Sequence, residues 1–268
     1  MEAQSKYAQL AEVRLHYLDW EGAGATPLLI LPGLAGSAHN WSHVAEALAG
    51  DRRVIVVEER GQGLSGWKPD YRLDVFVREV GEFVDAVGLE YFSLLGASLG
   101  GRVAYRFAAR NEARLDRLVI VDIAPSRPHP NAELPPPEHA ESYADPQDAL
   151  AALRRIGSRV DEVFFKDRFA HNYRRRPDGR YVHTHDPQLA RQTVAELRAT
   201  EEDDLAQVHK IQVPTLLVHG ARSPMPLEEM RKVAEGMEKG MLVDIPDAGH
   251  AVYLDNPAAF LAAVRDFI

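Results

Sequence analysis

The sequence predicts an α/β fold built on a mostly parallel sheet, from two kinds of segment. Short, nearly continuous apolar runs rich in β-branched residues recur along the chain. Amphipathic stretches of helical length lie between several of them. Near-continuous apolar runs are typical of parallel strands covered on both faces, because such strands have no solvated side. Alternation of strands with helices is typical of a sheet whose helices pack on its faces.

Each expected element can be placed on the sequence. The expected strands read PLLILPG (27–33), RRVIVVEERGQG (52–63), YFSLLGAS (91–98), DRLVIVDIAP (116–125), VPTLLVHG (213–220) and GMLVDIPDAGH (240–250). The expected helices read RLDVFVREVGEFVDAVG (72–88), GGRVAYRFAARN (100–111) and, at the end of the chain, PAAFLAAVRDFI. This order predicts one core whose strands and helices alternate.

The pattern changes after residue 125. A proline-rich polar stretch predicts a linker, and helical stretches follow at about 147–169 and 187–208 with no clear strand between them. A short basic run, NYRRRPDGR, is expected to be a solvated loop. We therefore expect a core in two parts, 1–125 and 209–268, with a mostly helical insertion at 126–208.

Composition excludes several classes of function. The chain has 268 residues, no cysteine and a formal net charge of −9, so disulfides, thiol nucleophiles and thiolate metal sites are excluded. An acidic chain is a poor partner for nucleic acid or anionic membranes. No apolar run reaches the roughly 18 residues of a membrane span, and the polar N-terminus predicts no export signal. We expect a cytoplasmic protein that acts on a small molecule.

The stretch SLLGASLGGR places Ser98 in the pattern G-x-S-x-G, directly after an expected strand and before an expected helix. A serine at such a sharp turn projects its hydroxyl above the sheet, and the flanking glycines let the arms of the turn approach closely. The N-terminus of the following helix can stabilise negative charge at the same place. These features predict a nucleophile, while a glycine-rich turn with a capping serine stays open as the alternative.

Five motifs taken together resemble the α/β-hydrolase superfamily over nearly the whole chain. They are LPGLAGSAHNW after an early strand, ERGQGLS after the next, GASLGG at the elbow, DIAP after the following strand, and DAGHAVYLDNP near the end. The region between Ser126 and Leu205 matches only loosely, as an inserted cap would. The resemblance implies an α/β-hydrolase fold with a central mostly parallel sheet, flanking helices and an inserted helical cap.

The resemblance also implies roles for several residues. His250 would be the general base for Ser98, in the chain order serine, acid, histidine that this fold uses. The backbone N–H groups of Leu34 and Leu99 would hold the oxyanion, because they follow the first loop and the nucleophile respectively. Glu58, Arg60 and Gly61 would hold the loop beneath the site.

The third triad member departs from the commonest pattern. Most relatives carry an acid three residues after the glycine of PTLLVHG, and this chain has Ser223 there. Asp122, at the carboxyl end of the strand after the nucleophile strand, is the expected replacement, since neighbouring strands lie only about 4.8 Å apart. Some α/β-hydrolases carry the acid there. Ser223 would then be a fourth member that hydrogen-bonds to Asp122 or His250. Asp247 is a weaker candidate, and a capping role for Asp122 stays open.

Two other motifs suggest different chemistry. Residues 61–66 match G-x-G-x-x-G, but a proline-containing stretch follows instead of the helix that a dinucleotide site requires. His183 and His185 would share one face of a strand and could hold a metal with a third ligand, yet no such ligand is evident, and a polar loop is expected. We therefore expect neither a metal nor a cofactor.

The sequence thus predicts a serine hydrolase with a helical cap, most simply a carboxylesterase. Aromatic residues of the insertion, including Phe164, Phe165 and Phe169, suggest a hydrophobic pocket for the acyl or alcohol group. Lactone hydrolysis or C–C bond cleavage by the same triad stays open, because the insertion sets that choice. A hydrolase-fold protein that binds a ligand without turning it over is the remaining alternative.

Overall fold

A computed structural model describes residues 2–34, 36–125, 142–155, 160–199 and 201–268. Its main feature is an eight-stranded sheet with the order β1-β2-β4-β3-β5-β6-β9-β10, in which all pairs from β4 to β10 are parallel. The strands are β1 (Gln4–Gln9), β2 (Arg14–Trp20), β3 (Leu28–Leu31), β4 (Val54–Val57), β5 (Phe92–Ala97), β6 (Leu115–Val121), β9 (Thr215–Gly220) and β10 (Gly240–Ile245). This arrangement confirms the predicted mostly parallel sheet.

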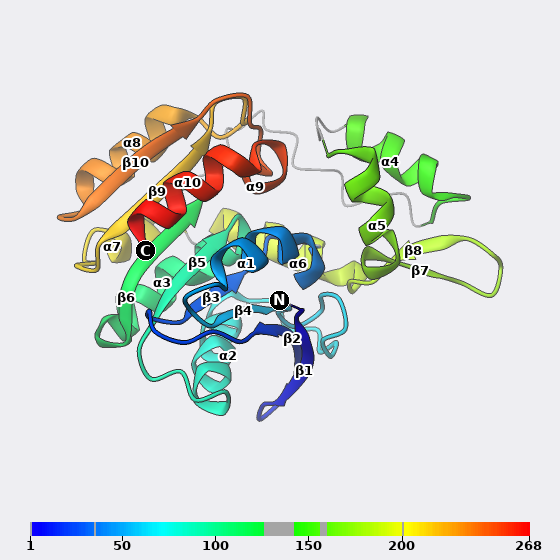
Figure 1. Cartoon of the computed structure of the whole chain (residues 1–268), viewed down its shortest axis with the longest axis horizontal. Helices are drawn as coiled ribbons and strands as arrows, with labels where there is room; N and C mark the ends of the chain where they lie inside the picture. Colours follow the sequence, from blue (N-terminus) through cyan, green and yellow to red (C-terminus); the bar gives the residue numbers. More distant parts are fainter. Residues whose placement is uncertain (1, 35, 126–141, 156–159, 200) are drawn as a thin grey trace.

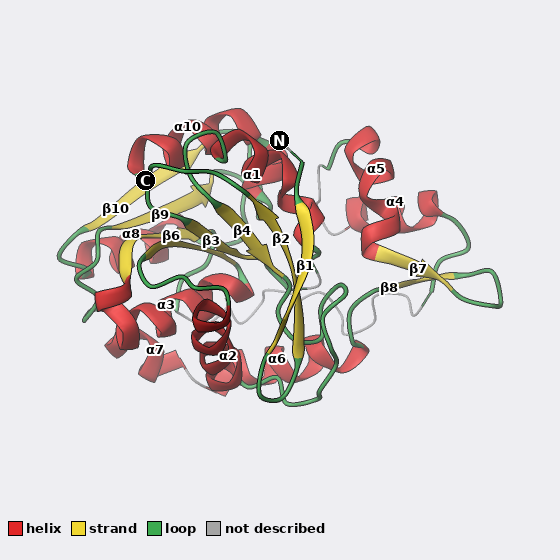
Figure 2. Cartoon of the chain, turned by 60° about the horizontal axis from the view of Figure 1, so that its bottom comes forward, coloured by secondary structure: helices red, strands yellow, loops and turns green. Residues whose placement is uncertain are grey.

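Helices cover both faces of the sheet (Figures 1 and 2). One face packs on α2 (Leu73–Ala86), α3 (Leu99–Asn111) and α8 (Leu227–Gly236), through a core that includes Phe83, Phe107 and Met230. The other face packs on α1 (Ser42–Leu48), α9 (Val252–Asp255) and α10 (Pro257–Phe267). Because both faces are covered, β3 and β4 are buried along their whole length, which explains their unbroken apolar sequences.

The first two strands were not predicted. β1 pairs antiparallel with β2, and β2 pairs antiparallel with β4, so they extend the parallel part of the sheet at one edge. β1 is mostly exposed and polar, which hides its strand character. β2 is almost wholly buried, but it carries His16 and Asp19, whose polar side chains are paired inside the protein. Polar residues on a buried strand break the apolar run that sequence reading depends on.

Part of the insertion forms a separate unit beside the core, at the right of Figure 1. It contains α4 (Pro146–Arg155), α5 (Glu162–Asn172) and a hairpin of β7 (Tyr173–Arg175) and β8 (Tyr181–His183). These elements share an aromatic cluster that includes Tyr143, Phe165, Phe169 and Tyr173. The hairpin differs from the expected solvated loop, because the start of the basic run is a strand that pairs with Tyr181–His183, just after the run, while Arg174 and Arg175 stay exposed.

The rest of the insertion lies against the core. α6 (Pro187–Ala199) and α7 (Glu201–Val208) place Leu189 and Val208 in the same apolar cluster as α2 and α3. The Tyr71 hydroxyl donates a buried hydrogen bond of 2.6 Å to Asp186, the residue before α6, and so ties the start of this helix to the core. Most of the expected linker, residues 126–141, lies outside the described residues. The boundaries at 126 and 208 stay a prediction.

Candidate active site

Ser98 lies at a sharp turn between β5 and α3, with φ of 51° and ψ of −114°. A non-glycine residue in this conformation is strained, and the surrounding packing maintains it. Gly96 and Gly100 allow the turn, because a Cβ on Gly96 would lie 2.3 Å from the Gly100 carbonyl oxygen and one on Gly100 would lie 2.3 Å from that of Leu31. The local geometry is that of a nucleophile elbow.

The structure brings together the three residues predicted to form a triad. His250 Nε2 lies 3.1 Å from Ser98 Oγ, and His250 Nδ1 lies 2.7 Å from Asp122 Oδ2. The register of the sheet explains why Asp122 reaches this place. Ala97 pairs with Val121, so Ser98 and Asp122 leave neighbouring strands at the same level. The Asp122 side chain is fully buried, whereas 47% of the His250 side chain is exposed.

Three donors surround the Asp122 carboxylate. The N–H of Gly220 donates to Oδ1 at 3.0 Å, while the His250 ring and the Ser223 hydroxyl both contact Oδ2. Ser223 Oγ also accepts the N–H of Met225 at 3.0 Å, so its own hydrogen is directed to Asp122. Donors of this kind favour the ionised form of a buried carboxylate. Ser223 thus contacts Asp122, as predicted for a fourth member.

Hydrogen bonding fixes the tautomer of neutral His250. An ionised Asp122 can only accept, so His250 Nδ1 carries the hydrogen and donates it. His250 Nε2 is then the bare nitrogen and accepts the hydrogen of the Ser98 hydroxyl. This arrangement is able to remove a proton from Ser98 as the serine attacks an electrophile.

The two residues predicted to bind an oxyanion, Leu34 and Leu99, belong to segments that lie next to Ser98. Leu99 is the first residue of α3, where helix N–H groups lack partners within the helix. Leu34 follows Gly33, and a Cβ on Gly33 would lie 3.2 Å from Ser98 Cβ, so this loop passes directly beside the nucleophile. Both positions suit donors to a developing oxyanion.

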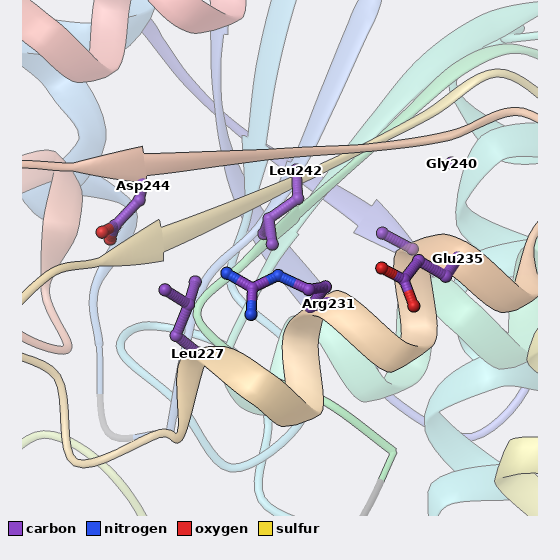
Figure 3. A pocket seen from close by; sticks show the side chains of 7 residues that line it. Leu227, Arg231, Glu235, Gly240, Leu242 and Asp244 are labelled. Atoms are coloured by element: carbon purple, nitrogen blue, oxygen red, sulfur yellow. The ribbon is translucent and has the colours of Figure 1, made fainter.

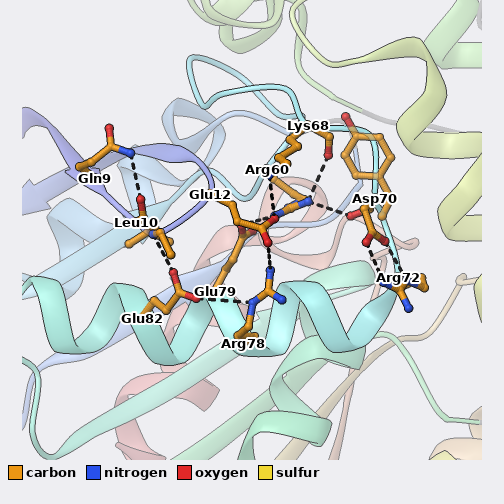
Figure 4. Close-up of polar contacts among 12 residues, drawn as sticks. Gln9, Leu10, Glu12, Arg60, Lys68, Asp70, Arg72, Arg78, Glu79 and Glu82 are labelled. Atoms are coloured by element: carbon orange, nitrogen blue, oxygen red, sulfur yellow. Dashed lines mark hydrogen bonds and ion pairs between the residues drawn. The ribbon is translucent and has the colours of Figure 1, made fainter.

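Buried charged side chains hold the loop that follows β4. Glu58 accepts the N–H groups of Ala38 at 2.8 Å and Leu64 at 2.6 Å, and it also contacts His16. Arg60 pairs with Glu79 and donates to the carbonyl oxygens of Lys68 and Asp70, as Figure 4 shows.

The third loop residue predicted from the sequence, Gly61, is in the left-handed region with φ of 78°. Its carbonyl oxygen accepts the N–H of Asp186 at 2.7 Å, which joins the loop to the start of α6. Residues 61–66 form turns, and the next helix begins only at Leu73. The structure therefore lacks the helix that a dinucleotide fingerprint would have to open at this position.

Two carboxylates near His250 have structural contacts. Asp247, the weaker acid candidate, pairs with Arg222, and both side chains are exposed. Asp255 accepts the N–H of Gly249 at 2.8 Å and so holds the histidine loop from the other side. This contact was not predicted, because nothing in the motif indicates which backbone group Asp255 reaches.

The aromatic residues expected to line a pocket are engaged elsewhere. Phe165 and Phe169 are buried in the insertion's own cluster. Phe164 lies beneath the guanidinium of Arg168, with 4.0 Å between the charge and the ring centre, and it contacts His43 edge-on. Phe165 and Phe169 therefore stabilise the insertion itself, and Phe164 connects the insertion to the core through His43.

Histidines of the insertion also make packing contacts. His183 is tilted against Tyr173, with ring centres 4.4 Å apart, and His185 is buried beside it. Within the described part of the chain, no group of three or more His, Cys, Asp or Glu side chains is placed to hold a metal ion.

Comparison with known proteins places this geometry in a family. The family model described as "alpha/beta hydrolase fold" matches residues 26–257. The chain belongs to this family. It is 29% identical to N-formylmaleamate deformylase of Pseudomonas putida, over 96% of this chain and 93% of that protein. It is 26% identical to an sn-1-specific diacylglycerol lipase of Mus musculus, over 97% of this chain and 87% of the relative.

A solved structure agrees with this membership. The crystal structure of an alpha/beta hydrolase from Novosphingobium aromaticivorans superposes with a TM-score of 0.86 at 27% identity, and the match covers 99% of this chain and 98% of the other. The relatives are hydrolases that act on different bonds, so the family alone leaves the substrate undefined. Separately, none of the helices described here has the length and apolar character needed to cross a membrane.

Proposed function

We propose that the protein is a serine hydrolase that cleaves carboxylic esters through an acyl-enzyme on Ser98. The observation that carries this proposal is the hydrogen-bonded row of Ser98, His250 and Asp122 at the carboxyl edge of the sheet. The strained turn at Ser98 supports it, since that backbone exposes the hydroxyl to a substrate.

Acylation follows from the contacts of the three side chains. Ser98 Oγ attacks the ester carbonyl carbon as its proton passes to His250 Nε2. Asp122 stabilises the imidazolium that forms and keeps Nδ1 protonated. The N–H groups of Leu34 and Leu99 bind the negative oxygen of the tetrahedral intermediate. One such donor is typically worth about 3 kcal/mol in the transition state. His250 then protonates the leaving alcohol, and the acyl group stays on Ser98.

Deacylation uses the same groups with water as the nucleophile. His250 takes a proton from water as the water oxygen attacks the acyl carbon. The bond from that carbon to Ser98 Oγ then breaks, His250 returns the proton to Oγ, and the carboxylic acid leaves. Ser223 would act as a fourth member through its hydrogen bond to Asp122. Throughout the cycle, this bond and the one from Gly220 keep the carboxylate oriented toward His250.

We further propose that the insertion acts as a cap over the site. Its α5 meets the short helix η1 (Ala38–Trp41), which follows the loop that carries Leu34. Asn172 and Asn40 exchange side-chain hydrogen bonds, and Arg168 donates to the His39 carbonyl oxygen at 2.9 Å. The rings of His39 and His171 stack with 3.5 Å between their centres. A cap held at this point would restrict which small molecules reach Ser98.

Two relatives favour different bonds. The lipase supports ester cleavage, because its name specifies a diacylglycerol substrate. The deformylase favours a second candidate, hydrolysis of an N-formyl amide by the same triad. The amide route requires His250 to protonate a nitrogen leaving group, and the half-exposed His250 ring is available for either leaving group.

The test is to incubate the protein with a fluorophosphonate probe, then measure intact mass and map the modified peptide. We expect one adduct on Ser98, and no adduct in Ser98→Ala. Hydrolysis rates on matched panels of esters, lactones and N-formyl amides would then identify the bond. An unlabelled wild-type protein that remains folded would overturn the proposal, and a non-catalytic binding protein would be the better description. Labelled protein that prefers amides would replace esterase by deformylase.

A further inference from the structure

His219 is a buried histidine on β9 that the proposed mechanism does not use. Only 3% of the residue is exposed. Its Nδ1 lies 2.8 Å from Asp244 Oδ1 on the neighbouring strand β10, and its Nε2 lies 2.8 Å from the carbonyl oxygen of Met225. A buried ring with two short contacts to different segments fixes those segments relative to each other.

The chemistry of the two partners determines the protons on this ring. An ionised carboxylate and a backbone carbonyl can only accept hydrogen bonds. Both bonds therefore form together only when His219 carries a hydrogen on each nitrogen. The contact to Met225 requires a hydrogen on Nε2 in every case.

Met225 connects His219 to the proposed catalytic groups. Its carbonyl oxygen accepts from His219, and its N–H donates to Ser223 Oγ at 3.0 Å. The Ser223 hydroxyl in turn donates to Asp122 Oδ2, the oxygen that also contacts His250. Loss of the His219–Met225 bond would free the peptide segment that sets the position of the Ser223 hydroxyl.

The outer end of this chain of contacts reaches the surface. Asp244 is 42% exposed and lines a surface pocket of about 410 Å³ between α8 and β10, shown in Figure 3. The other charged groups around this pocket are Arg231 and Glu235 of α8. Arg231 forms its ion pair with Glu228 on its own helix at 2.8 Å, so Asp244 is held mainly by His219.

We propose that His219 is a positioning residue for the triad acid. It holds the peptide at Met225, which directs the Ser223 hydroxyl onto Asp122 and so keeps the carboxylate aligned with His250. This inference rests on the proposed function, because it assigns His219 a part in arming Ser98. It explains why a hydrogen-bonded His–Asp pair is placed at the end of β9 beside the segment that carries a serine in place of the usual acid.

Two variants separate the contacts of His219. In His219→Gln the side-chain amide can reproduce the Nε2 donor toward Met225, whereas in His219→Asn it can reproduce only the Nδ1 donor toward Asp244. We expect His219→Asn to slow fluorophosphonate labelling of Ser98 by about tenfold, the usual scale for a lost hydrogen bond. His219→Gln should restore most of the rate. His209→Asn, the same change at an exposed histidine, serves as the control for the substitution itself.

A double-mutant cycle tests the route through Ser223. If His219 acts through that hydroxyl, His219→Asn should cause almost no further loss in a Ser223→Ala background. Equal losses in both backgrounds, or a wild-type rate in His219→Asn, would overturn the proposal. Should His219→Asn fail to fold, ¹⁵N NMR of wild-type His219 decides instead, by showing whether Nε2 carries a hydrogen. An Nε2 without a hydrogen could not donate to the Met225 carbonyl oxygen, and this result would overturn the proposal.

A second readout keeps this inference separate from the proposed function. We expect the hydrogen between His250 Nδ1 and Asp122 to give a downfield proton resonance, which can be recorded without any substrate. A wild-type protein that fails to label would overturn the hydrolase proposal alone. The positioning role would still stand if His219→Asn shifts that resonance and His219→Gln does not, and it would fall if neither variant shifts it.

Discussion

Asp122 and Glu59 are two buried carboxyl groups near the ends of strands in the same sheet, and their surroundings differ. Asp122 follows β6 and accepts from Gly220, Ser223 and His250. Glu59 follows β4 and accepts one bond, from the Gln62 side chain at 3.0 Å. The other oxygen of Glu59 has no partner in the described structure. Burial is nearly complete for both groups, at 0% and 3% exposed.

The difference lies in the hydrogen-bond donors that each buried carboxyl group has. Burial raises the pKa of Glu59 to about 8, and the nearby carboxylate of Glu79 adds to the rise while Gln62 opposes it. Glu59 is therefore protonated at neutral pH. Asp122 has three donors in place of one, and donors to a carboxylate oxygen favour its ionised form. Only the surroundings of Asp122 suit the role proposed for it, which is to stabilise the imidazolium of His250.

The largest test of this comparison removes the charge of Asp122. In Asp122→Asn, the amide cannot stabilise protonated His250, and it can favour the wrong tautomer of the neutral ring. We expect turnover to fall by about 10³- to 10⁴-fold, the scale seen when other triads lose this charge. The measurement is kcat on the best ester of the panel, with the unfolding transition recorded to confirm that the variant is folded.

Asp247→Asn is the matched control, because it removes a carboxylate three residues from His250 that pairs only with Arg222 among the contacts described. It should retain turnover within about twofold, since exposed ion pairs contribute little. Full activity in Asp122→Asn together with a large loss in Asp247→Asn would reverse the two assignments.

The elements that could be predicted from the sequence are those that depend on nearby residues alone. The glycines around Ser98 mark a turn whose two arms approach closely, and the apolar runs mark buried strands. Both patterns can be recognised in a single sequence. The position of Asp122 could be predicted as well, because strand order places β6 beside β5. Contacts that depend on register and side-chain reach could not be predicted. His219 meets Asp244 only because their strands pair at that residue, and no motif marks this.

The same limit applies to the insertion and to the first strands. The hairpin of β7 and β8 begins within a basic run whose composition favours a solvated loop. Its stability comes from stacking of Tyr173 on Phe169, with ring centres 4.5 Å apart, which is a tertiary contact. β2 was hidden because its polar side chains are satisfied by residues far along the chain, such as Glu58 for His16.

The second test concerns Glu59, the carboxyl group that is protonated at neutral pH. In Glu59→Gln, the side chain keeps nearly the same size and is neutral at every pH. The ordinary pKa of this carboxyl is 4.5, against about 8 in the folded protein. A raised folded pKa stabilises the fold fully below 4.5, and this stabilisation is lost as pH rises toward 8. We expect the variant to gain stability relative to wild type across that window, by up to about 1.4 kcal/mol per pH unit.

The measurement for Glu59 is the free energy of unfolding from urea titrations at intervals between pH 4.5 and 9. The two proteins should differ least at the acid end, and the difference should level off above pH 8. Glu79→Gln provides a contrasting variant, because it removes the buried partner of Arg60 and should be destabilising. A constant difference between wild type and Glu59→Gln at all pH values would mean that Glu59 is already ionised in the folded protein.

The smallest expected effect is on stability and concerns His39, a histidine whose ring is partly buried. His39 Nδ1 is buried without a partner in the described structure, and its ring stacks on His171 between η1 and α5. Burial lowers the pKa of His39 from 6.5 to about 4, and the neighbouring His171 adds to the decrease. The ring is therefore neutral at pH 7, as Glu59 is, because burial opposes the charged form of both groups.

A lowered folded pKa reverses the pH dependence expected for Glu59. The stability that neutral His39 contributes is complete above pH 6.5, and it is lost as pH falls toward 4, because the unfolded chain takes up a proton that the folded chain refuses. His39→Phe keeps an aromatic ring on His171 without this titration. Relative to wild type, it should gain less than about 1.4 kcal/mol per pH unit through this window, since His39 is half-buried and partly screened by solvent. Urea unfolding at pH 7.5, 6, 5 and 4 measures the gain, and an equal difference at all four values would show that the stack tolerates the charge.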